Sequence, residues 1–321
     1  TTITGLLLGE DVLRTAAAMA ALGAQVDTGN PGGGTGPWKV RGRGIGGLTE
    51  PADVLDMGNS GTGARLIAGV LAAYPFTSVM TGDASLRKRP MQRVITPLSQ
   101  TGAKFMARAG GRLPMAIAGS PMMLPLTYES PVASAQVKTA ILLAGLSASG
   151  GTAVSDSADS RDHTERMLRS FGVPCQERRL TVSIHPAPLK APRGALHVPG
   201  DFSSAAFLIA AGLIVPGSKL TLHEVNTNVT RSRMLSVVER WRASVSVARE
   251  QCRDDDEREP YGDIEVEYGA LAPAKVDVDS VWIPQLIDEI PDIAMLAAFA
   301  GGSLRIRGAA ELRVKESDRI E

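Results

Sequence analysis

The sequence predicts an α/β protein of two domains, built from repeated βαβαββ units whose sheets surround their helices. Three observations predict this architecture: strand-like runs that recur at a fixed period, glycines that end helical segments, and helical segments that are apolar on nearly every side. Such a period is typical of repeat architectures, in which each copy buries its apolar face against neighbouring copies.

The strand-like runs recur roughly every 75 residues and open each copy of the unit. They lie at residues 1–4, 77–80, 152–154, 220–222 and 304–306. In three copies the following helical segment ends on a glycine, at Gly23, Gly102 and Gly172, and Arg242 takes this place in the fourth copy. Gly just past a helix adopts the left-handed conformation at little steric cost, so these positions predict helix ends.

A second recurring element is a helical segment of small residues, at residues 61–73, 134–146, 203–215 and 290–300. Each segment is rich in Ala and Leu and apolar nearly all round, which predicts that it is buried. Buried helices flanked by strands predict a domain with helices inside and sheets outside. We expect three units around a pseudo-threefold axis to enclose one helical core.

The predicted break between domains lies near Val198-Pro199-Gly200, after a proline-rich run, and gives domains 1–199 and 200–321. The chain begins inside the first repeat and stops as a helix begins. We therefore expect an internal fragment, with a first domain lacking its N-terminal segment and a second domain lacking its last repeat.

Composition excludes several classes of partner. Aromatic residues make up only 4% of the chain, and the formal net charge is +0, which argues against single-stranded nucleic acid, duplex DNA and anionic membranes. The longest apolar stretch, residues 205–215, is too short to span a bilayer. Cys175, Cys252 and the four scattered histidines lack metal-ligand spacing, so we expect no metal, no cofactor and a reducing, cytoplasmic location.

Basic side chains gather at the corner between strand and helix in the later copies. They are Arg87, Lys88, Arg89 and Arg93, then Arg161 and Arg166, then Arg231 and Arg233, then Arg313, Lys315 and Arg319. A cation near a helix N-terminus is unfavourable by roughly 0.3–1 kcal/mol, and a bound anion reverses that sign. Solvated helix faces would explain any single corner, whereas the repetition predicts a small substrate with several negative charges.

Two further patterns carry little weight. Residues 42–47 match the glycine spacing of a dinucleotide site, but no helix follows them because Pro51 interrupts the chain. Residues 249–259 form a charge run, which predicts a solvated loop.

Several segments, taken in order, closely resemble the EPSP synthase (3-phosphoshikimate 1-carboxyvinyltransferase) family, and its class II members in particular. They are the turn Asp56-Met57-Gly58-Asn59-Ser60-Gly61, the stretch Leu86-Arg87-Lys88-Arg89-Pro90, Ser134-Ala135-Gln136, Arg161-Asp162-His163-Thr164-Glu165, Ile287-Asp288-Glu289-Ile290-Pro291 and Arg313-Val314-Lys315-Glu316-Ser317-Asp318-Arg319. The similarity runs over essentially the whole chain. It implies the enolpyruvyl transferase fold, with the active site between the two domains.

The resemblance also implies the reaction, which moves the enolpyruvyl group of phosphoenolpyruvate to the 5-hydroxyl of shikimate 3-phosphate and releases phosphate. In the family pattern Asp288 accepts the hydroxyl proton and Glu316 protonates the methylene carbon. Gly61, Arg89, Gln136 and Arg319 match the phosphoenolpyruvate contacts. Ser134, Ala135, Gln136, Arg161, Asp288 and Lys315 match the shikimate 3-phosphate contacts. Structural roles are the alternatives, with Asp288 as a helix N-cap and Glu316 as a partner of Lys315.

The family's N-terminal Lys-Ser-x-Ser-x-x-Arg element and its C-terminal Asp-His-Arg segment are absent from this sequence, which puts independent turnover in question. Gly61 stands where some glyphosate-tolerant relatives carry Ala, so we expect the full-length protein to be inhibited by glyphosate. We expect a monomer.

Two alternatives come from different classes. One is UDP-N-acetylglucosamine enolpyruvyl transferase, whose reactive Cys has no counterpart at residues 83–90. The other is a non-catalytic anion-binding fragment.

Overall fold

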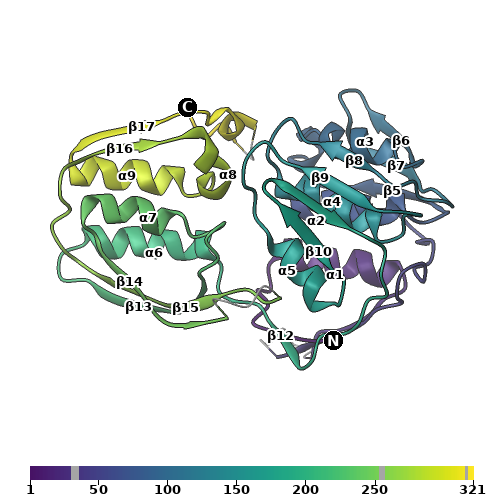
Figure 1. Ribbon diagram of the computed structural model, residues 1–321, viewed down its shortest axis with the longest axis horizontal. Helices are drawn as coiled ribbons and strands as arrows, with labels where there is room; N and C mark the ends of the chain where they lie inside the picture. Colours follow the sequence, from purple (N-terminus) through teal and green to yellow (C-terminus); the bar gives the residue numbers. More distant parts are fainter. Residues whose placement is uncertain (30–35, 253–256, 315–316) are drawn as a thin grey trace. The chain divides into compact units, whose positions relative to one another are not determined.

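The computed structural model describes residues 1–29, 36–252, 257–314 and 317–321 of the chain (Figure 1). The chain divides into two compact units, the first formed by residues 1–157 and 167–198 and the second by residues 158–166 and 199–321. The division between Val198 and Pro199 lies beside the break expected from the sequence. The grouping of residues 158–166 with the second unit was not expected, and it runs through helix α5 (His163–Ser170).

The first unit contains three four-stranded sheets with one shared topology. Their strand orders are β12-β1-β3-β2, β4-β5-β7-β6 and β8-β9-β11-β10. In each sheet the first two strands are parallel and the remaining neighbours are antiparallel. This threefold repetition confirms the repeat architecture that the sequence predicted.

The strands of these sheets are short, as the spacing of turns along the sequence requires. They are β1 (Thr2–Thr4), β2 (Gln25–Asp27), β3 (Trp38–Arg41), β4 (Leu55–Asp56), β5 (Thr77–Thr81), β6 (Lys104–Arg108), β7 (Arg112–Ala118), β8 (Thr127–Glu129), β9 (Thr152–Ser155), β10 (Cys175–Arg178), β11 (Thr181–Ile184) and β12 (Ala195–His197). Strand β12 pairs in parallel with β1, with Thr2 opposite Ala195, so the last strand of the unit completes its first sheet.

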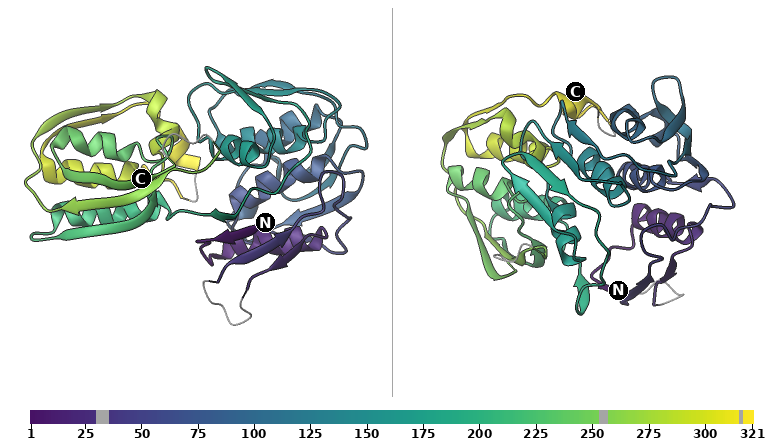
Figure 2. Two further views of the ribbon diagram at one scale, coloured as in Figure 1. Left: turned by 60° about the horizontal axis from the view of Figure 1, so that its bottom comes forward. Right: turned by 45° about the vertical axis from the view of Figure 1, so that its right-hand side comes forward.

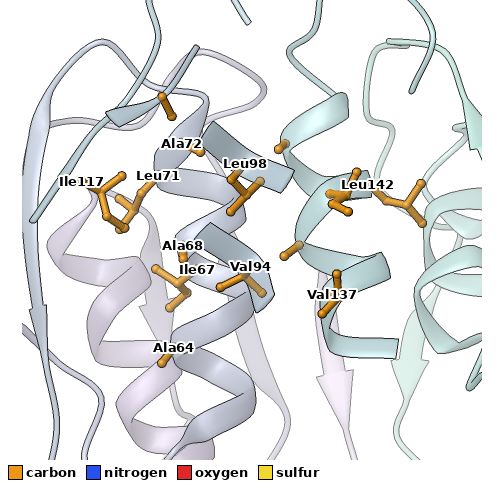
Figure 3. Close-up of a cluster of buried hydrophobic side chains, with 14 of the residues drawn as sticks. Ala64, Ile67, Ala68, Leu71, Ala72, Val94, Leu98, Ile117, Val137 and Leu142 are labelled. Atoms are coloured by element: carbon orange, nitrogen blue, oxygen red, sulfur yellow. The ribbon is translucent and has the colours of Figure 1, made fainter. Parts of the chain in front are cut away.

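Two helices of the first unit, at Gly61–Ala72 and Ala135–Gly145, lie in its core, as predicted. The helices are α1 (Glu10–Ala21), α2 (Gly61–Ala72), α3 (Gln92–Ser99) and α4 (Ala135–Gly145), with the short 3-10 helix η1 (Leu86–Lys88). Figure 3 shows Ile67 and Leu71 of α2 among side chains of α3 and of strand β7. Helices α2 and α4 approach so closely that a Cβ at Gly69 would lie 2.2 Å from the Ala140 carbonyl oxygen. Only glycine fits at that contact.

The helix ends predicted at the repeat glycines are confirmed. Gly23, Gly102 and Gly172 have φ angles of 95°, 102° and 80°. Arg242, the fourth member, takes the same left-handed conformation with φ of 55° and follows η2 (Glu239–Trp241). A repeat position can therefore keep its backbone conformation after losing its glycine, at some steric cost.

The second unit also combines short sheets with apolar helices. Strands β13 (Lys219–Asn226), β15 (Tyr261–Glu267) and β14 (Ser244–Gln251) form an antiparallel sheet, and β16 (Ala274–Val278) pairs in parallel with β17 (Gly302–Ile306). Helices α6 (Phe202–Ile214), α7 (Met234–Val238) and α9 (Ile290–Ala300) lie between the two sheets (Figures 1 and 2). The shorter elements are α8 (Ile283–Leu286), η3 (Ser280–Trp282) and η4 (Ala310–Val314).

The prediction that all four small-residue helices are buried nearly all round is wrong for the second unit. Phe207 and Leu208 of α6 are 65% and 52% exposed, and Phe299 of α9 is 63% exposed. The opposite faces of both helices are buried in the core of the unit. Composition predicted burial correctly, but which faces are covered depends on how many layers surround each helix.

The charge run at residues 249–259 is only in part the solvated loop that the sequence predicted. Its first residues belong to β14, residues 253–256 lie outside the described part, and the Glu259 side chain is only 21% exposed. Glu259 accepts hydrogen bonds from Asn226 at 3.0 Å and Asn228 at 3.1 Å, and pairs with His163 at 2.8 Å. Its carboxylate therefore holds residues 158–166 to the rest of the second unit.

This cluster predicts an acid-sensitive fold. Burial acts to raise the pKa of Glu259, but the hydrogen bonds and charge of His163 and the amides of Asn226 and Asn228 outweigh it and lower the pKa from 4.5 to about 2. The ionised Glu259 carboxylate therefore stabilises the fold at pH values above the pKa of the unfolded chain. This contribution is lost as the pH falls toward 2. The full contribution is about 3 kcal/mol.

Urea unfolding between pH 5.5 and 2.5 measures this effect. We expect Glu259→Gln to be less stable than wild type at pH 5.5 and to lose less stability on acidification. Glu267→Gln is the control, because Glu267 is 59% exposed and pairs with Lys219 only at 3.8 Å. Parallel pH profiles for wild type and Glu259→Gln would contradict the assignment.

Among the described residues no helix is both long enough and apolar enough to cross a membrane. The same residues contain no group of three or more His, Cys, Asp or Glu side chains that could hold a metal ion.

Candidate active site

In the first unit, three of the four predicted phosphoenolpyruvate contacts lie around one arginine. Arg65, on the second turn of α2, donates from Nη1 to the carbonyl oxygen of Gly61 at 3.2 Å and to Oε1 of Gln136 at 2.9 Å. Its Nη2 donates to the carbonyl oxygen of Pro90 at 3.2 Å, next to Arg89. Gly61, Arg89 and Gln136 come from three separate segments of the chain, and Arg65 holds these segments together.

Arg65 also fixes the orientation of the Gln136 amide. Because Oε1 faces Arg65, Nε2 faces α2 and donates to Oγ1 of Thr62 at 2.7 Å. The Arg65 side chain is buried, as the residue is only 8% exposed. Sequence reasoning did not assign Arg65 a role. A charged residue in an otherwise apolar buried helix was the signal that could have found it.

Arg89 is positioned by a hydrogen-bonded turn that precedes it. Its Nη2 donates to Oδ1 of Asn59 at 2.7 Å, and Nδ2 of Asn59 donates to Asp83 at 2.6 Å. Asp83 also accepts from the backbone N–H of Leu86 at 2.6 Å. That backbone hydrogen bond, followed by the Asn59 amide, lowers the pKa of Asp83. The ionised carboxylate thus orders the loop that carries Arg89.

Ser134 and Ala135, two predicted shikimate 3-phosphate contacts, lie at the start of α4. Ala135 is the first residue of the helix, and Ser134 precedes it in an extended conformation. Within the described part of the chain the Ser134 hydroxyl does not cap the helix. Both residues therefore neighbour Gln136 at the end of α4 where the backbone N–H groups carry partial positive charge.

In the second unit, the predicted base Asp288 lies between two predicted anion-binding arginines. Arg161 Nη2 donates to Asp288 Oδ2 at 2.6 Å, and Arg319 Nη1 donates to Asp288 Oδ1 at 3.1 Å. The three side chains are 23–25% exposed, so they are partly desolvated but open to solvent. Residues distant in sequence thus form one charged group with a net charge of about +1.

The alternative reading of Asp288 as a helix N-cap is wrong. The N-cap of α9 is Glu289, and the Asp288 carboxylate accepts from side chains instead. The predicted residues Lys315 and Glu316 lie outside the described residues.

The third basic corner, with Arg231 and Arg233, departs from the expectation of an anion site. Arg231 is buried and pairs with Glu289 at 2.7 Å and Asp201 at 3.3 Å. Arg233 donates to Gln285 at 2.7 Å and lies 5.4 Å from the centre of the Trp282 ring. Arg161 and Arg319 face one partly exposed carboxylate, whereas Arg231 is surrounded by protein acceptors. The same residue type therefore has different partners at equivalent positions of the repeat.

The two groups offer complementary chemistry. The first unit supplies a guanidinium, an oriented amide and a helix N-terminus, all suited to binding phosphate or carboxylate. The second unit supplies a carboxylate that can accept a proton and two arginines that can bind anions.

Comparison with known proteins agrees with this inventory. The family model described as EPSP synthase (3-phosphoshikimate 1-carboxyvinyltransferase) matches residues 1–321. A protein of Gluconobacter oxydans (strain 621H), named 3-phosphoshikimate 1-carboxyvinyltransferase, is 50% identical over 324 residues, covering 100% of this chain and 71% of the relative. A protein of the same name from Granulibacter bethesdensis (strain ATCC BAA-1260 / CGDNIH1) is 51% identical over 332 residues, covering 100% of this chain and 70% of the relative.

A solved structure of EPSP synthase from Acinetobacter baumannii has the same fold. It superposes with a TM-score of 0.85 at 40% sequence identity, covering 100% of this chain and 70% of the solved one. The expected enolpyruvyl transferase fold is thereby confirmed, and the family match favours the shikimate-directed reading over its two alternatives. The chain belongs to the EPSP synthase (3-phosphoshikimate 1-carboxyvinyltransferase) family.

Proposed function

We propose that this chain binds phosphoenolpyruvate and shikimate 3-phosphate and transfers the enolpyruvyl group to the 5-hydroxyl of shikimate 3-phosphate. The observation that carries the proposal is the Asp288 carboxylate held by Arg161 and Arg319 at 2.6 and 3.1 Å. A base needs a fixed position, and anionic substrates need cations near that base.

In the proposed reaction the 5-hydroxyl oxygen forms a bond to the central carbon of phosphoenolpyruvate. Asp288 accepts the hydroxyl proton, and Glu316 gives a proton to the methylene carbon. The carbon–oxygen bond to phosphate then breaks, the methyl carbon returns a proton, and the enol ether is restored. Asp288 and the phosphate-binding arginines act without a cofactor.

Arg161 and Lys315 bind shikimate 3-phosphate together with Ser134, Ala135 and Gln136, and Arg319 binds phosphoenolpyruvate together with Gly61, Arg89 and Gln136. Before substrate arrives, Asp288 is the carboxylate that Arg161 and Arg319 pair with. An incoming phosphate or carboxylate competes for these two guanidinium groups. Substrate binding therefore releases Asp288 to accept the hydroxyl proton.

The proposal is tested by incubating the purified chain with both substrates and following phosphate release and product by mass spectrometry. We expect turnover that requires both substrates together. Calorimetry with shikimate 3-phosphate alone gives a separate measure of binding. Turnover of neither substrate, with no heat of binding, would reject the proposal. Parallel sedimentation and cell fractionation test the expected monomer and cytoplasmic location.

Replacing Gly61 by Ala is expected to weaken phosphoenolpyruvate binding. The added methyl would lie 2.9 Å from Arg89 Nη1 and 3.1 Å from Arg65 Nη1, closer than carbon and nitrogen normally approach. The guanidinium groups of Arg89 and Arg65 must therefore shift, and Arg89 is a proposed contact of the substrate anion. We expect the KM for phosphoenolpyruvate to rise about tenfold, with a smaller change in kcat.

Gly42→Ala is the matched control, since a Cβ at Gly42 has no heavy atom within 4 Å. It should leave KM unchanged. For the same steric reason we propose that glyphosate inhibits the wild-type protein and that Gly61→Ala needs more glyphosate for half-inhibition. Equal KM values for Gly61→Ala and wild type would contradict the assignment of Arg89.

A further inference from the structure

A buried charged cluster adjoins Asp288 in the second unit and takes no part in the proposed proton transfer. Glu289 is 0% exposed, and its Oε1 accepts hydrogen bonds from Arg231 Nη1 at 2.7 Å and from the Ser203 hydroxyl. Arg231 also donates to the Ser203 hydroxyl oxygen and to Asp201 at 3.3 Å. Every side chain in the cluster therefore contacts at least one other member.

The cluster joins three segments that are far apart in sequence. Asp201 is the N-cap of α6 and accepts from the backbone N–H groups of Ser203 and Ser204. Arg231 lies in the loop before α7, and Glu289 is the N-cap of α9. Glu289 makes no side-chain capping bond within the described chain, so its side chain serves the cluster and not its own helix.

The Glu289 carboxyl group is fully buried and only partly satisfied by hydrogen bonds. Its second oxygen, Oε2, is buried and lacks a hydrogen-bond partner among the described residues. Burial raises the pKa of Asp292, one turn further along α9, and the charge of Glu289 raises it further. A buried ion pair often contributes less to stability than apolar residues of similar volume, so fold stability alone gives little reason to keep this one.

We propose that Glu289, held by Arg231 and Ser203, is a positioning residue for the Asp288 carboxylate. Its side chain anchors the peptide next to Asp288, while Arg161 and Arg319 hold the Asp288 carboxylate itself. A base displaced by about 1 Å can lose roughly a hundredfold in rate, so an anchor one residue away is enough to matter. This inference rests on the proposed function.

The test compares Glu289→Gln, Glu289→Asp and Asp292→Asn in the full chain. Gln keeps the shape of the side chain but removes the charge that holds Arg231. We expect kcat to fall about 10- to 100-fold for each folded molecule, with the KM for phosphoenolpyruvate changed less than about threefold. Asp keeps the charge and should recover most of kcat. Asp292→Asn alters a neighbouring buried carboxyl and should leave kcat within about threefold of wild type.

Thermal unfolding of each variant reports how much of it is folded at the assay temperature. A purely structural role would lower the melting temperature and leave the kcat of folded molecules unchanged, which would overturn the inference. An equal loss of kcat in Asp292→Asn would also overturn it. A wild-type chain without turnover would overturn the proposed function and this inference together, whereas an active wild type with an unaffected Glu289→Gln rejects the inference alone.

Discussion

Replacing Asp288 by Asn is expected to lower kcat by about 10²- to 10⁴-fold, the range for removal of a positioned general base. Asn keeps the size of the side chain but cannot take the hydroxyl proton. It also leaves Arg161 and Arg319 without the carboxylate that they hold at 2.6 and 3.1 Å. Steady-state kinetics at saturating concentrations of both substrates measures the effect.

Asp277→Asn is the matched control for this variant. Asp277 lies on β16 of the same unit, its side chain is 50% exposed, and its ion pair with Lys275 is long at 3.9 Å. It should keep wild-type kcat. A kcat for Asp288→Asn within threefold of wild type would remove Asp288 from the chemistry and leave it a partner of the two arginines.

Replacing Arg231 by Met is expected to lower the free energy of unfolding by about 3–5 kcal/mol, the usual cost of leaving a buried charge without its partner. Arg231 is buried, and without it Glu289 loses its ion pair in a place where it is not exposed to solvent at all. The same variant also removes the link to Asp201 at the start of α6. Urea unfolding followed by circular dichroism measures the loss.

Two comparisons make this prediction specific. Arg249→Met removes an arginine that is 81% exposed and pairs with Asp263 at 3.4 Å, so it should cost less than about 1 kcal/mol. Arg231→Met combined with Glu289→Leu removes both charges and should recover most of the lost stability. Equal losses for Arg231→Met and Arg249→Met would show that burial of the pair does not matter.

Local sequence patterns predicted the repeat well because they report on the backbone. Gly23, Gly102, Gly172 and Arg242 take the left-handed conformation just past a helix, which is a local feature of the backbone. The small-residue helices were found for a similar reason, since helical periodicity and residue size are properties of a short window. The elements that surround such a helix cannot be predicted from a short window, which explains why Phe207 and Phe299 are exposed although their helices are apolar.

The partners of the basic residues could not be predicted from the local sequence. Arg161, Arg231 and Arg319 occupy similar positions in successive repeats, and no local sequence pattern distinguishes them. The fold pairs Arg161 and Arg319 with the partly exposed Asp288, but surrounds Arg231 with Glu289, Ser203 and Asp201. Whether an arginine binds a ligand or a protein carboxylate depends on partners that lie 28 to 127 residues away.

The residues that no motif assigned have the same explanation. The role of Arg65 depends on Gly61, Pro90 and Gln136, which meet around it in the fold. The role of Glu259 depends in the same way on Asn226, Asn228 and His163. By itself the sequence determined the repeating fold, the family resemblance and the identity of the charged residues. Tertiary structure alone decided which of those charges are buried with protein partners and which stay partly exposed, because burial and pairing depend on segments that meet only after folding.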